Sequence, residues 1–534
     1  MATATQQKVL GAFYTADPVA RFLVRWAIRR SDDTVLDPSC GDGVFLSAAG
    51  ARLLDIGSTN PQIWGVDVNP SALRNCRLRS THSNLLERDF FALKRGDLPA
   101  VAAVVGNPPF IRYQTFKGKQ RAAALESAAQ AGVRLPQLSS SWAPFVVHAS
   151  TFLRTGGRLA MVVPAEFMHA QYATEVIGYM VRKFARITVR MFQTKMFEAL
   201  SEDTVLLLCD GYGQRCEWLS ITPADCIEDA DPEDDRTVPV DIEAVRSGNH
   251  RLTRYLLSPR ARHLYEGMAS QEGVVRLGDA AEVGIGYVTG CNDYFHLTAL
   301  ERKTWRIPAR YLKPAVLSLR DFQGTVFRRS DWERRSEAGE KSHLLAIPDS
   351  DAPDVPNGLL EYLSHGRKQG VQNRFKCRVR QKWYSVPHIK IGDAFLSYMS
   401  GSSPKLVRNA GAFVAPNTLH IVQFDQGRHW SQFVAGWQSS LTKLSCEIEG
   451  HALGGGLLKL EPTEAENVRI ALPSVEVGRN LVGDLTLLLR EGKSVEATDL
   501  ADRVILRGQF GLSNSECGIL GGAARQLEKW RLHR

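Results

Sequence analysis

The stretch that decides the fold is VLDPSCGDGVFL, residues 35–46. An apolar run ends at Asp37, a glycine-containing turn follows, and a helical pattern begins near Val44. Gly41 and Gly43 would let the backbone approach a bound nucleoside closely, where a side chain would collide. Asp37 would end a strand on the crevice side of an open sheet, where its carboxylate could bind an ammonium group. A short glycine motif alone often occurs by accident, so at this point only the strand, turn and helix are predicted.

A second acid follows at the end of the next predicted strand. The sequence IWGVDVNP, residues 63–70, places Asp67 30 residues after Asp37. In nucleotide-binding α/β folds, an acid at the end of the second strand accepts hydrogen bonds from ribose hydroxyls. The two strand-end carboxylates together therefore predict a nucleoside site.

The third motif indicates the chemistry. Residues 102–110 read AAVVGNPPF, an apolar strand that runs into Asn107, Pro108, Pro109 and Phe110. Because consecutive prolines fix the backbone, the Asn107 amide oxygen and the Pro108 carbonyl can be held in fixed directions. Two acceptors aimed at one amino group would bind both its hydrogens and direct its lone pair at an electrophilic methyl group. Phe110 would offer a flat face to a planar base. A strand that ends in Pro-Pro is common, so this interpretation depends on the two motifs before it.

With these motifs the chain resembles the Taq-type, gamma-class adenine-N6 DNA methyltransferases. The order of motifs agrees, with an N-terminal motif, cofactor motifs, a catalytic motif and a long C-terminal part. The resemblance implies S-adenosyl-L-methionine (AdoMet) as cofactor, and methyl transfer from a sulfonium requires no metal ion. GAFYT (11–15) is similar to the motif that folds over AdoMet, and DPSCGDG (37–43) to the motif at its methionine end. The cofactor-binding residues that the resemblance implies are Tyr14, Thr15, Asp37, Gly41, Gly43, Asp67, Asp89 and Phe90, the last two from RDFF (88–91).

The resemblance also implies the residues that act on the target base. NPPF is the catalytic motif of the family, which assigns Asn107, Pro108 and Phe110 to the reacting adenine. In the family, an aromatic residue of a late hairpin stacks on the extruded adenine. The matching position is Phe197, with Phe192 as the alternative. The implied reaction rotates the nucleotide out of the duplex, because a stacked amino group cannot reach a buried cofactor.

The pattern along the chain predicts two folded regions. Over the first two hundred residues, apolar runs alternate with helical patterns, which is typical of a parallel sheet with crossovers. The last two strands of this region follow each other with almost no helix between them and should pair antiparallel. We therefore expect an α/β fold with a doubly wound, mixed seven-stranded AdoMet-methyltransferase sheet, followed by a mixed, β-rich recognition domain. The predicted strands are 34–37, 63–67, 102–105, 159–163, 187–191 and 205–209, and the predicted helices are 18–29, 44–54, 70–79, 142–154 and 173–184.

Charge runs set the expected domain boundaries. The run DCIEDADPEDD, residues 225–235, has seven carboxylates and is interpreted as a solvated loop between domains. The predicted division is a catalytic domain over 1–222, an acidic linker over 223–250, and a target-recognition domain with a helical tail over 251–534.

A second charge run predicts how DNA is bound. Residues 362–392, the basic stretch, contain eight Lys or Arg and no acid, with aromatic residues between them. We expect phosphate contacts there from Arg374, Lys376, Arg378, Arg380 and Lys382.

Composition agrees with these expectations. The 534 residues favour two or three domains, and a net charge of +9 makes a polyanionic partner plausible. The nine cysteines include no CxxC pair, which argues against a disulfide framework or a zinc ribbon. The sequence shows no signal peptide and no long apolar run, so a cytoplasmic protein without a membrane span is expected. The expected partners are double-stranded DNA and a separate restriction endonuclease.

Three other functions stay open on the sequence alone. Enzymes that methylate a glutamine side chain share the Asn-Pro-Pro-aromatic motif, but they need no basic stretch. An RNA adenine methyltransferase is not distinguished by charge, since both nucleic acids are polyanions. A non-catalytic DNA-binding subunit that keeps the methyltransferase fold is the alternative from a different class. The intact NPPF and cofactor motifs argue against it.

Overall fold

The contacts in a computed structural model divide the chain into two compact units. The first comprises residues 1–257 with 453–455 and 532–534, and the second comprises residues 258–452 and 456–531. The structure describes residues 15–112, 114–192, 204–216, 218–224, 226–227, 230–231, 237–246, 251–348, 355–453 and 455–532.

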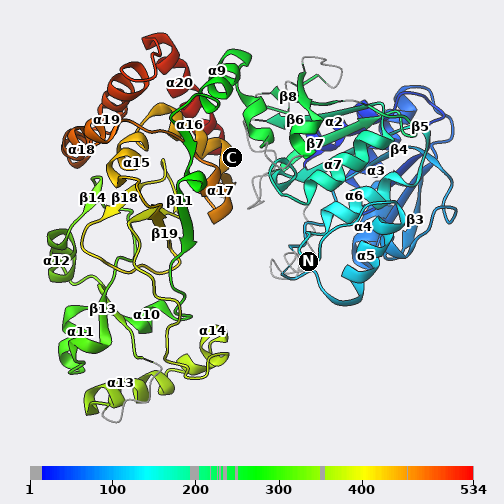
Figure 1. The fold of residues 1–534 in the computed structure, drawn as a ribbon. Helices are drawn as coiled ribbons and strands as arrows, with labels where there is room; N and C mark the ends of the chain where they lie inside the picture. Colours follow the sequence, from blue (N-terminus) through cyan, green and yellow to red (C-terminus); the bar gives the residue numbers. More distant parts are fainter. Residues whose placement is uncertain are drawn as a thin grey trace. The chain divides into compact units, whose positions relative to one another are not determined.

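A nine-stranded mixed sheet forms the centre of the first unit (Figure 1). Its order is β3-β2-β1-β4-β5-β7-β6-β8-β9, and the first five strands are parallel. β7 lies between β5 and β6 and pairs antiparallel with both. The strands are β1 (Val35–Asp37), β2 (Ile63–Asp67), β3 (Ser83–Glu87), β4 (Val101–Gly106), β5 (Leu153–Pro164), β6 (Arg186–Phe192), β7 (Thr204–Asp210), β8 (Trp218–Ala224) and β9 (Val238–Asp241). The predicted doubly wound sheet and the antiparallel pairing of its last two predicted strands are confirmed.

The helices of the first unit follow local signals in the sequence. α4 begins where the Asn69 side chain accepts hydrogen bonds from the amides of Ser71 and Ala72, and Pro70 occupies its first turn. Every residue of α6 is buried, and it ends at Ser150, earlier than predicted, because β5 already begins at Leu153. The helices are α2 (Asp17–Ala27), α3 (Val44–Asp55), α4 (Pro70–Arg79), α5 (Gly118–Gln130), α6 (Trp142–Ser150), α7 (Ala173–Lys183) and α8 (Ile242–Arg246).

The predicted seven strands and the predicted acidic linker need correction. The sheet has nine strands, and the expected boundary at residue 222 falls inside β8. β9 lies within the segment expected to be linker and pairs antiparallel with β8, so it extends the sheet of the first unit. The carboxylates of 225–235 led to the prediction of a linker that also included VPVD, residues 238–241, but Val240 in this segment is buried. High charge in one segment therefore did not mark the end of the folded unit.

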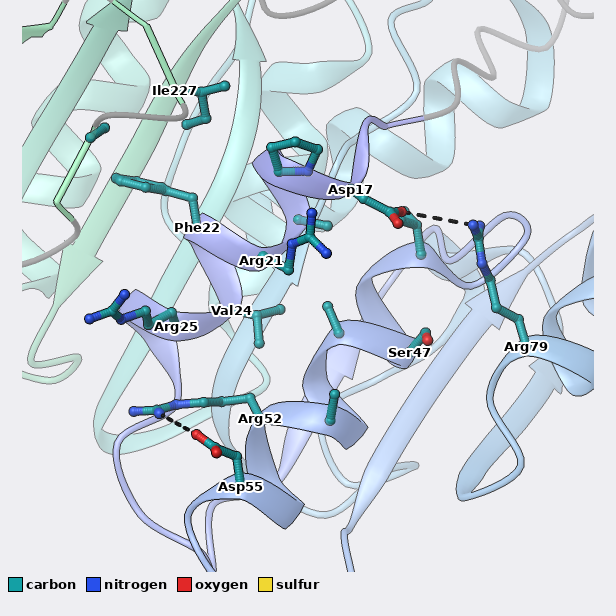
Figure 2. Close-up of a pocket in the computed structure, with 16 residues that line it drawn as sticks. Asp17, Arg21, Phe22, Val24, Arg25, Ser47, Arg52, Asp55, Arg79 and Ile227 are labelled. Atoms are coloured by element: carbon teal, nitrogen blue, oxygen red, sulfur yellow. Dashed lines mark hydrogen bonds and ion pairs between the residues drawn. The ribbon is translucent and has the colours of Figure 1, made fainter.

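A groove between α2 and α3 gives a second reason for this correction. It has a volume of about 970 Å³ and is lined by Arg21, Arg25 and Arg52 together with Ile227 (Figure 2). Ile227 comes from the acidic run but is only 9% exposed. Its apolar side chain is buried as part of the first unit, so the run is not a fully solvated loop.

The second unit contains a five-stranded sheet of order β11-β19-β16-β18-β14 and several smaller sheets. One apolar core lies at the five-stranded sheet around Phe327, Phe395 and Phe413, and another includes Tyr294, Phe295 and Cys377. Figure 1 shows α10, α11, α13 and α14 near one end of this unit and α18, α19 and α20 near the other. The predicted β-rich region is confirmed.

The strands from residue 258 on are β10 (Val274–Arg276), β11 (Ala281–Ile285), β12 (His296–Leu297), β13 (Leu312–Pro314), β14 (Val326–Phe327), β15 (His343–Leu345), β16 (Ala394–Ser397), β17 (Met399–Ser400), β18 (Leu406–Asn409), β19 (Leu419–Phe424), β20 (His451–Leu453), β21 (Leu457–Lys459) and β22 (Arg469–Ala471). The helices are α9 (Pro259–Ala269), α10 (Asn292–Phe295), α11 (Ala299–Thr304), α12 (Arg329–Glu337), α13 (Asn357–Lys368), α14 (Phe375–Arg378), α15 (Trp430–Gly436), α16 (Ser440–Glu449), α17 (Pro462–Asn467), α18 (Val475–Arg490), α19 (Ser494–Ala501) and α20 (Asn514–Leu532). Among the described residues, none of these helices is long and apolar enough to cross a membrane.

Candidate active site

A cavity of about 390 Å³ is lined by the loops that follow β1, β2, β3 and β4. These loops meet because the carboxyl ends of neighbouring parallel strands lie at one edge of the sheet. Six of the predicted site residues line the cavity, namely Thr15, Gly41, Asp67, Asp89, Phe90 and Asn107. The motifs read separately from the sequence therefore surround one space.

Asp37 is fully buried at the end of β1. Its Oδ1 accepts a hydrogen bond from the Ser39 amide at 3.1 Å, whereas none of the described residues donates to Oδ2. Burial raises the pKa of Asp37 well above its usual range. Asp37 does not itself line the cavity, but its neighbours Pro38 and Ser39 do. A buried carboxylate oxygen without a donor fits a ligand that brings a positive charge or N–H groups.

Gly41 and Gly43 differ in their surroundings. Both have positive φ angles, +51° and +86°, which favour glycine. Gly41 lines the cavity and its amide donates to Asp67 Oδ2 at 2.9 Å. Gly43 does not line the cavity, and a Cβ there would lie 2.6 Å from the Cys76 sulfur. Gly43 thus lets the start of α3 pack closely on α4.

Asp67 joins the first two loops. Its Oδ2 accepts from the Gly41 amide, and its Oδ1 accepts from the Asn69 amide at 2.8 Å. Its partial burial raises its pKa. Each carboxylate oxygen keeps a second lone pair, so a pair of ribose hydroxyls can still be accepted here.

Aromatic rings form another wall of the cavity. Phe90 is 3% exposed, and its ring centroid lies 5.0 Å from that of Phe145 and 4.8 Å from that of His148. Asp89 accepts from the Phe91 amide at 3.0 Å. Phe91 and Phe145 also line the cavity, although the sequence did not single them out. Phe91 belongs to the RDFF motif, but Phe145 comes from α6 and had no motif to identify it.

The NPPF loop presents an acceptor without a partner. Asn107 Nδ2 donates to Thr15 Oγ1 at 3.1 Å, which fixes the orientation of the amide. Asn107 Oδ1 is buried, and the described part of the chain provides no donor to it. The backbone carbonyl of Asn107 accepts from Ser39 Oγ at 3.1 Å. This loop is therefore attached to the β1 loop while one side-chain oxygen stays available for a ligand.

Ser141 holds the same loop from the other side. Its hydroxyl donates to the Pro109 carbonyl and accepts from the Ile111 amide at 2.8 Å, and its own amide donates to the Ile111 carbonyl at 3.0 Å. Sequence reasoning missed Ser141, because the two segments are about thirty residues apart and no local pattern connects them.

Other predicted catalytic residues are placed differently. Phe110 is 8% exposed and does not line the cavity, so its ring is not presented as an open stacking face in this structure. Phe192, the alternative to Phe197, is a core residue whose ring packs edge-on against Phe22 at 6.3 Å. Tyr14 and Phe197 lie outside the described residues.

The predicted DNA-binding residues fall into two groups in the second unit. Arg374, Lys376 and Arg378 are exposed on or beside α14. Arg380 is half-buried, donates from Nη2 to the Val288 carbonyl at 2.5 Å and lies 5.9 Å from the Phe295 ring centroid. Lys382 is also half-buried. The structure thus leaves three of the five cations open to a polyanion and ties Arg380 to the protein.

Comparison with known proteins agrees with this geometry. The model of the N-6 DNA methylase family matches residues 1–212, which include all the cavity motifs. Residues 1–212 are thus similar to the N-6 DNA methylases. The predicted resemblance to adenine-N6 DNA methyltransferases is confirmed. Residues 249–506 match a second family, described as the C-terminal domain of the type II methyltransferase M.Eco57I.

Individual relatives match this chain along most of its length. Type II methyltransferase M.AccI from Acinetobacter calcoaceticus is 21% identical over 86% of this chain and 84% of its own. Type II methyltransferase M.XamI from Xanthomonas campestris pv. amaranthicola is 22% identical over 87% of this chain and 85% of its own. The structure of the type IIL restriction–modification enzyme MmeI in complex with DNA is similar with a TM-score of 0.60. It is 12% identical, and the match covers 99% of this chain and 80% of that enzyme.

Proposed function

We propose that this methylase transfers a methyl group from AdoMet to the exocyclic N6 of an adenine in a specific duplex DNA sequence, after that adenine has rotated out of the duplex. The observation that carries the proposal is the buried Asn107 Oδ1, which lacks a donor in the described chain and belongs to a residue that lines the cavity built by the cofactor motifs. DNA methyl transfer as the activity and AdoMet as the cofactor agree with the family of residues 1–212.

The residues around the cavity fit the parts of AdoMet. The proposed roles are Asp67 for the ribose hydroxyls, Asp89 for the adenine amino group and the Phe90–Phe91 pair for the adenine ring. The Asp37 Oδ2 oxygen has no donor among the described residues and suits the ammonium group at the methionine end, but Asp37 does not line the cavity, so this contact would require the β1 loop to adjust. When bound, AdoMet supplies an electrophilic methyl group on a sulfonium.

The NPPF loop would align the target nitrogen. Asn107 Oδ1 is available as an acceptor, and none of the described residues donates to the Pro108 carbonyl. Together they can accept both hydrogens of the adenine amino group, which turns the nitrogen lone pair toward the methyl group. With AdoMet bound, the nitrogen that Asn107 and Pro108 hold would form a bond to the methyl carbon as the sulfur–carbon bond breaks with its electron pair on sulfur, and the amino nitrogen would then lose one proton to solvent. Alignment therefore supplies much of the rate.

Phe110 and Phe197 remain the residues proposed to contact the flipped base. Because the Phe110 ring is 8% exposed, its contact with a base would require the loop to adjust when DNA binds. Arg374, Lys376 and Arg378 are proposed to contact phosphates, and so, less directly, is the half-buried Lys382. Arg380 is withdrawn from this set, because its guanidinium is bonded to Val288.

A separate restriction endonuclease that cuts the same sequence completes the proposal. Two relatives that match over most of their length are named as type II methyltransferases, which supports a role in protecting host DNA from such a nuclease.

Sequencing of modified DNA tests the proposed function. The wild-type chain and Asn107→Ala would be expressed in a host without adenine methylation, and the genome would be sequenced with a method that detects methylated bases. We expect one sequence motif with N6-methyladenine in the wild-type cells and none in the Asn107→Ala cells. A genome without any modified motif would contradict DNA as the substrate. If RNA from the same cells is methylated instead, the RNA alternative is correct.

A further inference from the structure

Two large apolar side chains are exposed within the basic stretch. Phe375 is 64% exposed and Val379 is 63% exposed. They begin and follow α14, four residues apart, so they lie on one side of this helical turn. Because both side chains are largely exposed, packing in a core does not explain why apolar residues occupy these two positions.

The backbone that presents them is held firmly. Cys377 is fully buried in the core around Tyr294 and Phe295, and its sulfur lies 3.6 Å from the Thr289 carbonyl. Arg380 is bonded to the Val288 carbonyl. A Cβ at Gly290 would come 2.8 Å from Lys376 Cβ, so only glycine allows the two segments to approach this closely. Residues 374–380, the α14 segment, are thus fixed on one side and exposed on the other.

The charges around Phe375 and Val379 favour a nucleic acid as their partner. Arg374, Lys376 and Arg378 are exposed, and Lys376 Nζ lies 5.8 Å from the Phe375 ring centroid. The basic stretch contains no acid that could pair with a basic partner. A second copy of this chain that docked through the same surface would place like charges opposite one another, whereas DNA offers phosphates beside apolar base surfaces.

We propose that Phe375 and Val379 contact the bases of duplex DNA and contribute to target selection, while the cations beside them bind the phosphates. This inference rests on the proposed function as a DNA methyltransferase. Phosphate contacts carry no sequence information, but apolar side chains distinguish bases through the thymine methyl group or by insertion at deformable base steps. The α14 segment would thereby combine both kinds of contact on one rigid turn.

The test compares apolar and charge variants of the same segment. Phe375→Ala/Val379→Ala removes the apolar surface, and Arg374→Gln/Arg378→Gln removes two charges. Leu300→Ala is the matched control, because Leu300 on α11 is 73% exposed and lies outside the basic stretch. Dissociation constants would be measured at several salt concentrations on two duplexes, one with the methylated motif and one with the same bases scrambled.

The apolar variant should lose about tenfold or more in affinity for the motif duplex, in line with base–aromatic stacking. Its affinity for the scrambled duplex and its salt dependence should stay unchanged. The charge variant should bind both duplexes more weakly and shallow the log–log salt slope by about 1.8. Thermal unfolding and AdoMet binding should be unchanged in both variants, since the replaced side chains are exposed.

Two results would overturn the inference. One is unchanged affinity of the apolar variant for the motif duplex. The other is an equal loss on both duplexes, which would assign the two side chains to sequence-independent binding. Either result would leave the proposed function standing as long as the wild-type protein methylates the motif. Failure of the wild-type protein to methylate DNA would instead refute the proposed function itself.

Discussion

At the scale of single residues, the burial of Asp37 leads us to predict a pH-dependent change in stability. Its folded pKa lies above the unfolded value of about 3.9, because the carboxyl is buried. Such a group stabilises the fold fully below pH 4 or so, and this contribution is lost as the pH rises through the folded pKa. Asp37→Asn removes the titration. The melting temperature of the AdoMet-free Asn variant relative to wild type should therefore be higher at pH 8 than at pH 4.

Calorimetric melting of both proteins across this pH range checks the prediction. With AdoMet present, the Asn variant should melt at a lower temperature than the wild type, since the variant loses a charged acceptor worth about 1.5–3 kcal/mol of binding. A difference in melting temperature that does not change with pH would show that folding does not raise the pKa of Asp37.

The proposed role of Asn107 leads to a prediction about the rate of methyl transfer. Asn107→Ala should lower kcat and kcat/KM together, by about 100-fold or more, because its oxygen acts on the reacting amino group. AdoMet affinity should change little. Thr15→Val is the matched variant, since it removes only the hydroxyl that accepts from Asn107 Nδ2. It should retain more activity than Asn107→Ala, and an equal loss in both variants would assign Asn107 to holding Thr15 rather than to the base.

At the scale of elements, Ser141 is the positioning residue of the NPPF loop. Ser141→Ala removes the hydroxyl that joins the Pro109 carbonyl to the Ile111 amide. We expect kcat to fall by about tenfold, as misplacement of reacting groups predicts, with AdoMet affinity unchanged. Ser141→Thr keeps a hydroxyl and should restore part of the rate. A rise in KM without a change in kcat would show that the loop does not depend on Ser141.

The basic stretch should separate into a binding part and a structural part. Arg380→Gln breaks a hydrogen bond to Val288 from a guanidinium whose pKa is lowered by burial, and should lower the free energy of unfolding by about 1–3 kcal/mol. Arg378→Gln, at an exposed position two residues away, should leave it unchanged. Urea unfolding of both variants gives the comparison. An equal loss of unfolding free energy in the two variants would contradict the assignment of a structural role to Arg380 and not to Arg378.

Some helices and strands could be predicted from sequence patterns and others could not. β2 and α4 have the bounds that were predicted, because an apolar run ends at an acid and Asn69-Pro70 marks a helix start. α5 was missed, since its many alanines and polar residues give no clear apolar face. β9 was missed because acidic residues precede it. The partners of Ser141 depend on folded geometry, which no local pattern contains.

At the scale of the whole molecule, the placement of charge is more informative than its sum. A net charge of +9 among 66 basic and 57 acidic residues distinguishes few proteins. The acid-free basic stretch lies in the part of the chain that matches the M.Eco57I C-terminal family, and the NPPF and cofactor motifs lie in the part that matches the N-6 DNA methylase family. We therefore propose that the first part binds the cofactor and carries out the chemistry and that the second part recognises DNA.

The most direct test of the central claim is the identity of the methylated nucleoside. Duplex DNA that contains the target motif would be incubated with the purified protein and AdoMet bearing an isotopically labelled methyl group, digested, and analysed by mass spectrometry. We expect labelled N6-methyl-2′-deoxyadenosine from the DNA treated with the wild-type protein, and no label with Asn107→Ala. Label found solely in methylcytosine, or absent from the DNA altogether, would contradict the central claim.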